Sequence, residues 1–236
     1  MKKLFVFILT SICLLSFTAC VTSLQPLVTY DKIISDQRIT GNWTSNDNND
    51  LQNLVIKVEL LSGSTLMKSL SKSELIDQKA FTYTGDAYKD SILFKNAYLI
   101  SYKENGATYN LVAALMKSGK NMFMDVHPAY MYDSTAPDTD TSPYDFNNDY
   151  LPGFTIAKVN FTANGVTLNF VDGELIENLT KEGKIKLKYE SNALFGTFLI
   201  TASSRDLQSF LEKYGDDERI FNKKTTVTLI RQPEHS

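Results

Sequence analysis

The sequence predicts an exported, mainly β protein with antiparallel strands and a helix before the last strand. Three observations support this fold class. An apolar N-terminal segment ends at a cysteine, Asn-Gly pairs separate segments in which apolar and polar residues alternate, and an amphipathic helix is predicted shortly before the C-terminus.

The N-terminal segment has the layout of a secretory signal. Lys2 and Lys3 precede an almost unbroken apolar run over residues 4–17, and small residues follow before Cys20. This run is shorter than the ~20 residues that a membrane-spanning helix needs. We therefore expect residues 1–19 to be cleaved. The alternative is a signal that is retained as a membrane anchor.

Composition limits the classes to which the remaining chain can belong. Removal of residues 1–19, which hold two of the 24 basic residues, leaves 22 basic against 27 acidic residues and a net charge of −5. A mildly acidic chain is a poor nucleic-acid binder, so no nucleic acid is expected as a partner. Cys13 lies within the signal, so stability must come from packing rather than from a disulfide.

Hairpin turns give the strongest structural signal, because Asn-Gly favours a two-residue turn between antiparallel strands. Asn-Gly pairs at residues 105–106 and 164–165 each separate two predicted strands, and Ser118-Gly119 leads to a further strand over residues 121–126. Apolar residues alternate with polar ones, as over residues 166–170. The pattern predicts a meander with one apolar face.

Two helices interrupt the strands. The clearer one covers residues 204–214, where Ser203 is the N-cap and an apolar stripe repeats at helical spacing. A shorter helix with an acidic start is predicted over residues 172–179. By contrast, residues 21–32 show no clear periodicity, and we expect them to be a tether.

The signal and three later segments of the chain resemble motifs of one family of bacterial proteins. The stretch that ends at Cys20 is similar to a lipobox, in which the cysteine is acylated and becomes the first residue of the mature protein. Gly41-Asn42-Trp43 resembles the Gly-x-Trp opener of lipocalins. Residues 109–128 resemble a hairpin followed by a Phe-x-Asp-x-x-Pro turn, and residues 199–221 resemble the strand and helix that precede the final strand.

On these motifs the chain resembles the bacterial lipocalin-like lipoproteins. This resemblance implies a lipocalin-like β-barrel over residues 36–232, interrupted by a loop insertion at residues 129–151. It implies a lipidated Cys20 followed by a tether to residue 35, and it makes Gly41 and Trp43 structural residues at the closed base of the barrel. The pattern yields nine to eleven strands, so a closed barrel and an open sheet both remain as alternatives.

Residues suited to catalysis are scarce. His127 and His235 are the only histidines, and the chain has no nucleophile motif or zinc-ligand spacing, so we predict no catalytic residue, metal or cofactor. Asp125 and His127 form a candidate polar site, although they can equally mark the end of a strand. The acidic residues 138–149 partly fit a calcium-loop register, but Pro143 stands where that loop needs glycine.

One modification site is suggested by resemblance. Asp133-Ser134-Thr135 is similar to the Asp-Ser/Thr-apolar sites at which exported proteins of the Bacteroidetes are O-glycosylated. Ser134 is therefore a candidate O-glycosylation site within the predicted insertion.

These observations lead to two expected functions. The first is a non-enzymatic envelope protein, held to the membrane by its N-terminal lipid, that binds a small apolar ligand or serves a protein partner. Val21 follows Cys20 in place of the aspartate associated with inner-membrane retention, which favours the outer membrane. The alternative is a carboxylate-based hydrolase or isomerase with Asp125 in the barrel mouth. The lining of the internal cavity separates the two.

Overall fold

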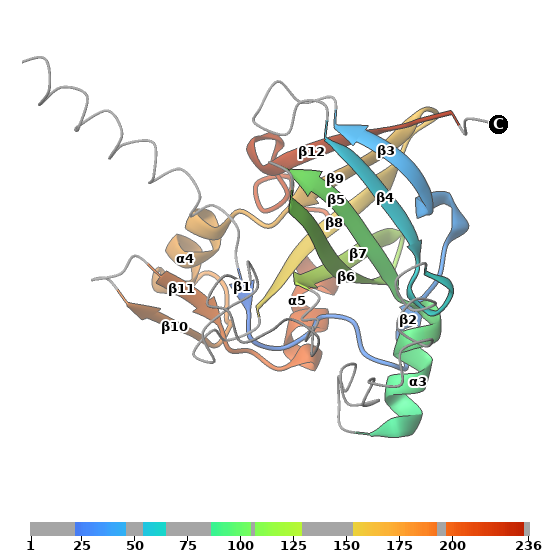
Figure 1. Ribbon diagram of the computed structural model, residues 1–236. Helices are drawn as coiled ribbons and strands as arrows, with labels where there is room; N and C mark the ends of the chain where they lie inside the picture. Colours follow the sequence, from blue (N-terminus) through green and yellow to red (C-terminus); the bar gives the residue numbers. More distant parts are fainter. Residues whose placement is uncertain are drawn as a thin grey trace, which may run out of the picture.

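The computed structural model describes residues 22–45, 54–64, 86–104, 107–128, 153–192 and 197–233. Eight of its strands form a closed antiparallel β-barrel (Figure 1). They are β3 (Gly41–Ser45), β4 (Val55–Leu60), β5 (Tyr98–Glu104), β6 (Ala107–Ser118), β7 (Asn121–Pro128), β8 (Phe154–Phe161), β9 (Gly165–Phe170) and β12 (Thr226–Arg231).

The last strand completes the barrel. Strands β3 to β8 pair in chain order, β9 pairs with β8, and β12 lies between β9 and β3. The register places Leu229 opposite both Val166 and Ser45. The predicted fold class is confirmed, and the barrel is closed rather than an open sheet.

Four short strands lie outside the barrel, which is why the sequence suggested more than eight. They are β1 (Thr22–Ser23), β2 (Ile33–Ile34), β10 (Tyr189–Asn192) and β11 (Thr197–Ile200). β1 inserts between β8 and β11, and β2 pairs with β6. The strands β1, β11 and β10 thus extend one edge of β8 into a small second sheet beside the barrel (Figure 1).

The tether prediction is wrong for residues 22–35. Besides forming β1 and β2, this segment buries Leu27 and Val28 almost completely. The segment crosses the outside of the barrel without regular structure between its two short strands, so its buried side chains follow neither a helical nor a strand period. Periodicity could not reveal that it belongs to the domain.

Helices cover the outside of the barrel. α4 (Gly173–Lys181) and α5 (Ser204–Tyr214) agree with the two predicted helices, and the Ser203 side chain caps α5 by accepting the Asp206 N–H. α3 (Ala87–Asn96) was not predicted, because it buries only Leu93 and has no apolar stripe. Short 3-10 turns are η1 (Gln37–Ile39), η2 (Leu61–Gly63) and η4 (Lys223–Thr225).

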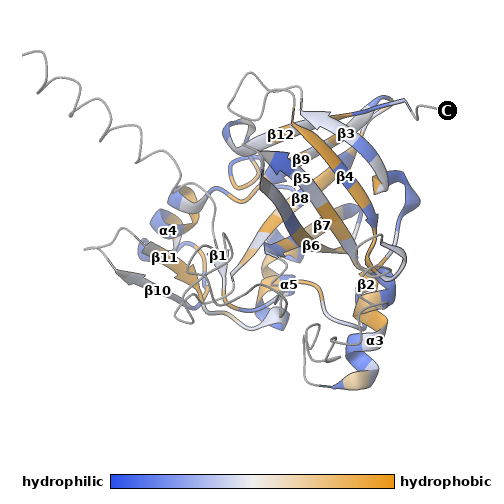
Figure 2. Cartoon of the chain, in the orientation of Figure 1, coloured by the Kyte–Doolittle hydropathy of each residue, from blue (hydrophilic) through white to orange (hydrophobic). Residues whose placement is uncertain are grey.

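Alternating side chains divide the apolar residues between the barrel interior and an outer core. On β7, Met124 belongs to the interior cluster, whereas Phe123 belongs to an outer cluster that also includes residues of α5 such as Leu211. Figure 2 shows hydrophobic residues on the barrel strands and on the helix faces that cover them. Strands β6, β7 and β8 place side chains in both clusters, so they are buried on both sides over part of their length.

The β8–β9 hairpin differs by one residue from the predicted turn. Phe161 pairs with Val166, and the Thr162 N–H donates to the Gly165 carbonyl at 2.9 Å, so the two turn residues are Ala163 and Asn164. Gly165 belongs to the strand instead. A Cβ atom at this position would lie 2.1 Å from the Leu229 carbonyl oxygen, so this glycine permits the close approach of β12.

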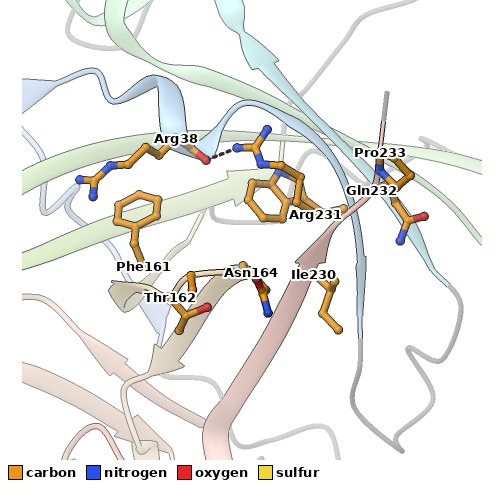
Figure 3. Close-up of a pocket in the computed structure, with 11 residues that line it drawn as sticks. Arg38, Phe161, Thr162, Asn164, Ile230, Arg231, Gln232 and Pro233 are labelled. Atoms are coloured by element: carbon orange, nitrogen blue, oxygen red, sulfur yellow. Dashed lines mark hydrogen bonds between the residues drawn. The ribbon is translucent and has the colours of Figure 1, made fainter. Parts of the chain in front are cut away.

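Trp43 closes one end of the barrel, which we call the base. Its side chain is 2% exposed, and its indole N–H donates to the Ile39 carbonyl at 2.9 Å. The Arg231 guanidinium lies over the indole, 4.5 Å from the ring centroid, and donates to the Arg38 carbonyl (Figure 3). Gly41 has a φ of 131°, and a Cβ there would lie 2.7 Å from Arg231 Nη1. The Gly-x-Trp segment thus makes room for the arginine that covers the tryptophan.

We predict that Trp43→Ala lowers the free energy of unfolding by ~3–5 kcal/mol, because it leaves a cavity where a buried aromatic side chain stood. Urea denaturation followed by circular dichroism measures the change. The matched control is Tyr88→Ala, which truncates an aromatic side chain that is 71% exposed and should change stability by less than ~0.5 kcal/mol. Equal effects of the two substitutions would contradict the role of Trp43 at the base.

Candidate functional site

The barrel encloses a cavity of about 550 Å³. The interior faces of all eight barrel strands, together with η1 and η4, supply its walls. The lining residues are Ile39, Trp43, Leu54, Ile56, Val58, Ile100, Tyr102, Leu111, Met124, Val126, His127, Pro128, Thr155, Val166, Leu168, Phe170, Lys224, Thr225, Thr226, Val227 and Leu229. The volume lies within the range of small-molecule sites in proteins.

The two ends of the cavity differ. At the base, Trp43 and Ile39 close it, and the paired residues Val166 and Leu229 line it beside them. At the other end, which we call the mouth, the lining includes Tyr102 and Phe170. The strands that end at the mouth continue into residues 46–53, 105–106 and 129–152, which lie outside the described part of the chain.

The lining is mainly aliphatic and aromatic. Its polar members lie towards the mouth, among them Thr155, Thr226 and the hydroxyl-bearing Tyr102, and Lys224 is the one lysine or arginine in the described lining. No aspartate or glutamate is among these residues. The described lining can therefore accept an apolar molecule.

Comparisons with family models, with curated proteins and with solved structures found no match. No helix among the described residues is long and apolar enough to cross a membrane.

Asp125 does not lie in the barrel mouth. It is on the face of β7 that points away from the cavity, as its neighbours Met124 and Val126 line the interior, and it is fully buried. Its Oδ2 accepts the backbone N–H of Val28 at 2.8 Å. The prediction that Asp125 lies in the barrel mouth, on which the enzymatic alternative depended, is thus wrong. Residues 22–34, which were expected to be a tether, cover the face of β7 on which Asp125 lies.

The environment of Asp125 favours its protonated form. Burial raises the pKa of this carboxyl group from 3.8 to about 7, although the N–H groups of Val28 and Leu27 act in the opposite direction. Its Oδ1 is buried and has no hydrogen-bond partner among the described residues. The carboxyl group therefore attaches the N-terminal segment to the barrel wall, which is a structural task.

His127 lies two residues further along the same strand. Its Nδ1 is 2.9 Å from the Pro128 carbonyl oxygen, and its ring lies 5.1 Å from the ring of Phe154. Burial lowers the pKa of His127 from 6.5 to about 4, so that the ring is neutral at pH 7. The structure describes no interaction between the His127 ring and the Asp125 carboxyl group that would make them a catalytic pair.

A second, more open hollow of about 810 Å³ lies on the outer side of the base (Figure 3). Arg38 and Arg231 both contribute to it. Arg38 forms an ion pair with Asp36 at 2.6 Å and lies over the Phe161 ring, and Arg231 is held between Trp43 and the Arg38 carbonyl. Because both guanidinium groups already have partners within the protein, this hollow is a weaker candidate than the barrel cavity.

Other predicted site residues lie outside the described part of the chain. They are Cys20, the proposed lipidation site, and Ser134, the candidate O-glycosylation site, together with the whole 129–151 insertion. Two residues of the cavity lining, Lys224 and Tyr102, were not predicted from the sequence. The alternation of apolar residues on β9 did predict an apolar face, and Val166, Leu168 and Phe170 do line the cavity.

Asp125 and His127 have opposite effects on stability over the same pH range. The pKa of folded Asp125, about 7, lies above its ordinary value, so stability falls as the pH rises from about 4 to about 7. The pKa of folded His127, about 4, lies below its ordinary value, so stability falls as the pH drops from about 6.5 to about 4. In the native chain the two slopes largely offset each other.

We predict that Asp125→Asn removes this compensation, since asparagine still accepts the Val28 N–H but cannot ionise. The free energy of unfolding of the variant should rise by on the order of 2 kcal/mol between pH ~4.5 and ~6.5, at up to ~1.4 kcal/mol per pH unit for one proton. Urea denaturation at several pH values measures it.

The control for this experiment is His127→Gln, in which only Asp125 still titrates. The free energy of unfolding of this variant should fall as the pH rises over the same range. A pH profile of Asp125→Asn that is as flat as the profile of the native chain would contradict the assignment of a raised pKa to Asp125.

Proposed function

We propose that this chain is a non-enzymatic lipoprotein of the bacterial cell envelope, in which a lipocalin-like barrel binds a small apolar ligand. The observation that carries the proposal is the barrel cavity, with a volume of about 550 Å³ and a lining that includes no carboxylate among the described residues. Pockets of this size and composition are typical of small-molecule sites.

The energetics of the cavity favour an apolar occupant. Each methylene group transferred from water to an apolar site contributes about 0.8 kcal/mol. A charged group deep in the cavity would instead meet Trp43, Val166 and Leu229, which offer no compensating partner, and this costs several kcal/mol. A ligand with a long or broad apolar part therefore fits the interior, and any polar end should lie towards the mouth.

The non-enzymatic part of the proposal rests on the position of Asp125. The alternative function needed this carboxylate at the mouth, and it lies instead on the outer face of β7 beneath residues 27 and 28. The anchored part rests on the lipobox-like stretch before Cys20, and the envelope location, with the outer membrane favoured, follows from it.

We predict that an apolar ligand quenches the fluorescence of Trp43, which is the only tryptophan of the chain and lines the base of the cavity. The probe is dodecanol brominated at its terminal carbon, because bromine quenches indole emission at contact. Titration should give saturable quenching with one site per chain.

Two variants with the same substitution test the location of the ligand. Val126→Phe narrows the cavity near its mouth, whereas Val55→Phe changes a residue that is 58% exposed. The first should weaken binding at least tenfold (about 1.4 kcal/mol), and the second should leave it unchanged. Equal affinities, or quenching that does not saturate, would remove ligand binding in the cavity from the proposal.

We also predict that Cys20→Ala abolishes acylation and blocks processing of the precursor, since the cysteine supplies the sulfur that carries the lipid. Metabolic labelling with an alkyne fatty acid, followed by gel analysis, measures both effects in one experiment. Equal label on the native chain and on the variant would overturn the lipoprotein part of the proposal and leave cavity binding untouched.

A further inference from the structure

The connection between Cys20 and the folded domain is short. Strand β1 begins at Thr22, and only Val21 lies between it and Cys20. Two steps along the chain of about 3.5 Å each, or roughly 7 Å, therefore separate the residue that would carry the lipid from the first residue of a sheet. The residues that follow cannot easily detach from the domain to extend this connection. The Leu24 N–H donates to the Ile200 carbonyl at 2.8 Å, and the side chains of Leu27 and Val28 are buried.

This short connection starts beside the mouth of the barrel. Thr22 pairs with Thr155, which lines the cavity at its mouth, and the Thr22 side chain fills the space beside Gly153. The base is distant from this point. From Thr155 to Phe161, at the base end of β8, the strand runs six residues, or roughly 20 Å, which is well beyond the reach of the connection.

Exposed side chains at the mouth suit a lipid surface. Tyr109 is 40% exposed and stacks on Tyr102, with 5.1 Å between ring centroids, and Val55 at the start of β4 is 58% exposed. Lys103 and Lys224 are exposed at the same end. Tyrosine and lysine are residues that commonly lie at the boundary between water and lipid, the first with its amphipathic ring and the second with its long apolar stem.

We propose that the mouth of the barrel faces the bilayer that holds the lipid anchor, so that an apolar ligand passes between the cavity and the membrane without crossing bulk water. The proposal rests on the anchored part of the proposed function. The partner surface is the headgroup region of the bilayer, and the rim formed by Val55, Tyr102, Lys103, Tyr109 and Lys224 is the part of the domain that contacts it.

The experiment measures the height of two labels above the membrane. In the mature lipidated protein Cys20 carries the lipid, and residues 21–236 hold no further cysteine, so one introduced cysteine takes a fluorophore specifically. Lys103→Cys places it at the mouth and Ala163→Cys at the base, both at exposed positions. Each protein is reconstituted into phosphatidylcholine vesicles that contain a small fraction of lipid with an energy acceptor on its headgroup.

Energy transfer should be several-fold more efficient from the Lys103→Cys label than from the Ala163→Cys label. Equal or reversed efficiencies in protein that floats with the vesicles would overturn the orientation and leave the anchor intact. Failure of the lipidated protein to float would overturn the anchor, and the orientation with it.

A spacer variant tests whether the short connection sets the orientation. A flexible Gly/Ser segment inserted between Val21 and Thr22 should preserve flotation and abolish most of the difference between the two labels. If the difference survives the insertion unchanged, the proposal that the short connection orients the barrel is overturned.

Discussion

The structure depends on the pairing of its last strand with two earlier ones. β12 joins β3 and β9, and no ring of strands exists without it. The same strand brings Arg231 over Trp43 and supplies Val227 and Leu229 to the cavity wall. Closure of the sheet, the cover of Arg231 over Trp43 at the base and part of the apolar interior therefore all depend on β12. A chain that lacked this strand would expose the edges of β3 and β9.

The N-terminal segment has a comparable role on the outside. Residues 22–34 connect the second sheet to the barrel wall through β1, through the Val28 N–H to Asp125 and through β2 on β6. The carboxyl group of Asp125 is costly to bury as an ion. Its oxygen nevertheless serves as the hydrogen-bond acceptor for the Val28 N–H, in a part of the segment that has no regular structure. The apolar face of α5 completes the core around this segment.

The frame of the barrel could be predicted because it is locally encoded. Asn-Gly and Ser-Gly turns with alternating strands specify the pairing of β5 with β6 and of β6 with β7, and a capped apolar stripe specifies α5. The cavity could not be predicted from the alternation of apolar residues, because the same inward-facing side chains would fill the interior of a narrower barrel completely. Likewise, the face of β7 on which Asp125 lies became clear only with the strand register, and the position of Gly165 depends on a neighbour 64 residues away, Leu229.

The insertion of β1 between β8 and β11 has a consequence for the order of folding. Thr22 pairs with Leu199, and Trp43 with Arg231, so both ends of the chain must be present before either the second sheet or the barrel is complete. Pairings so distant in sequence slow folding. Residues 22–34 leave the ribosome before the rest of the domain, yet they are among the last to find their place. Until then their apolar residues are available to chaperones or to other chains.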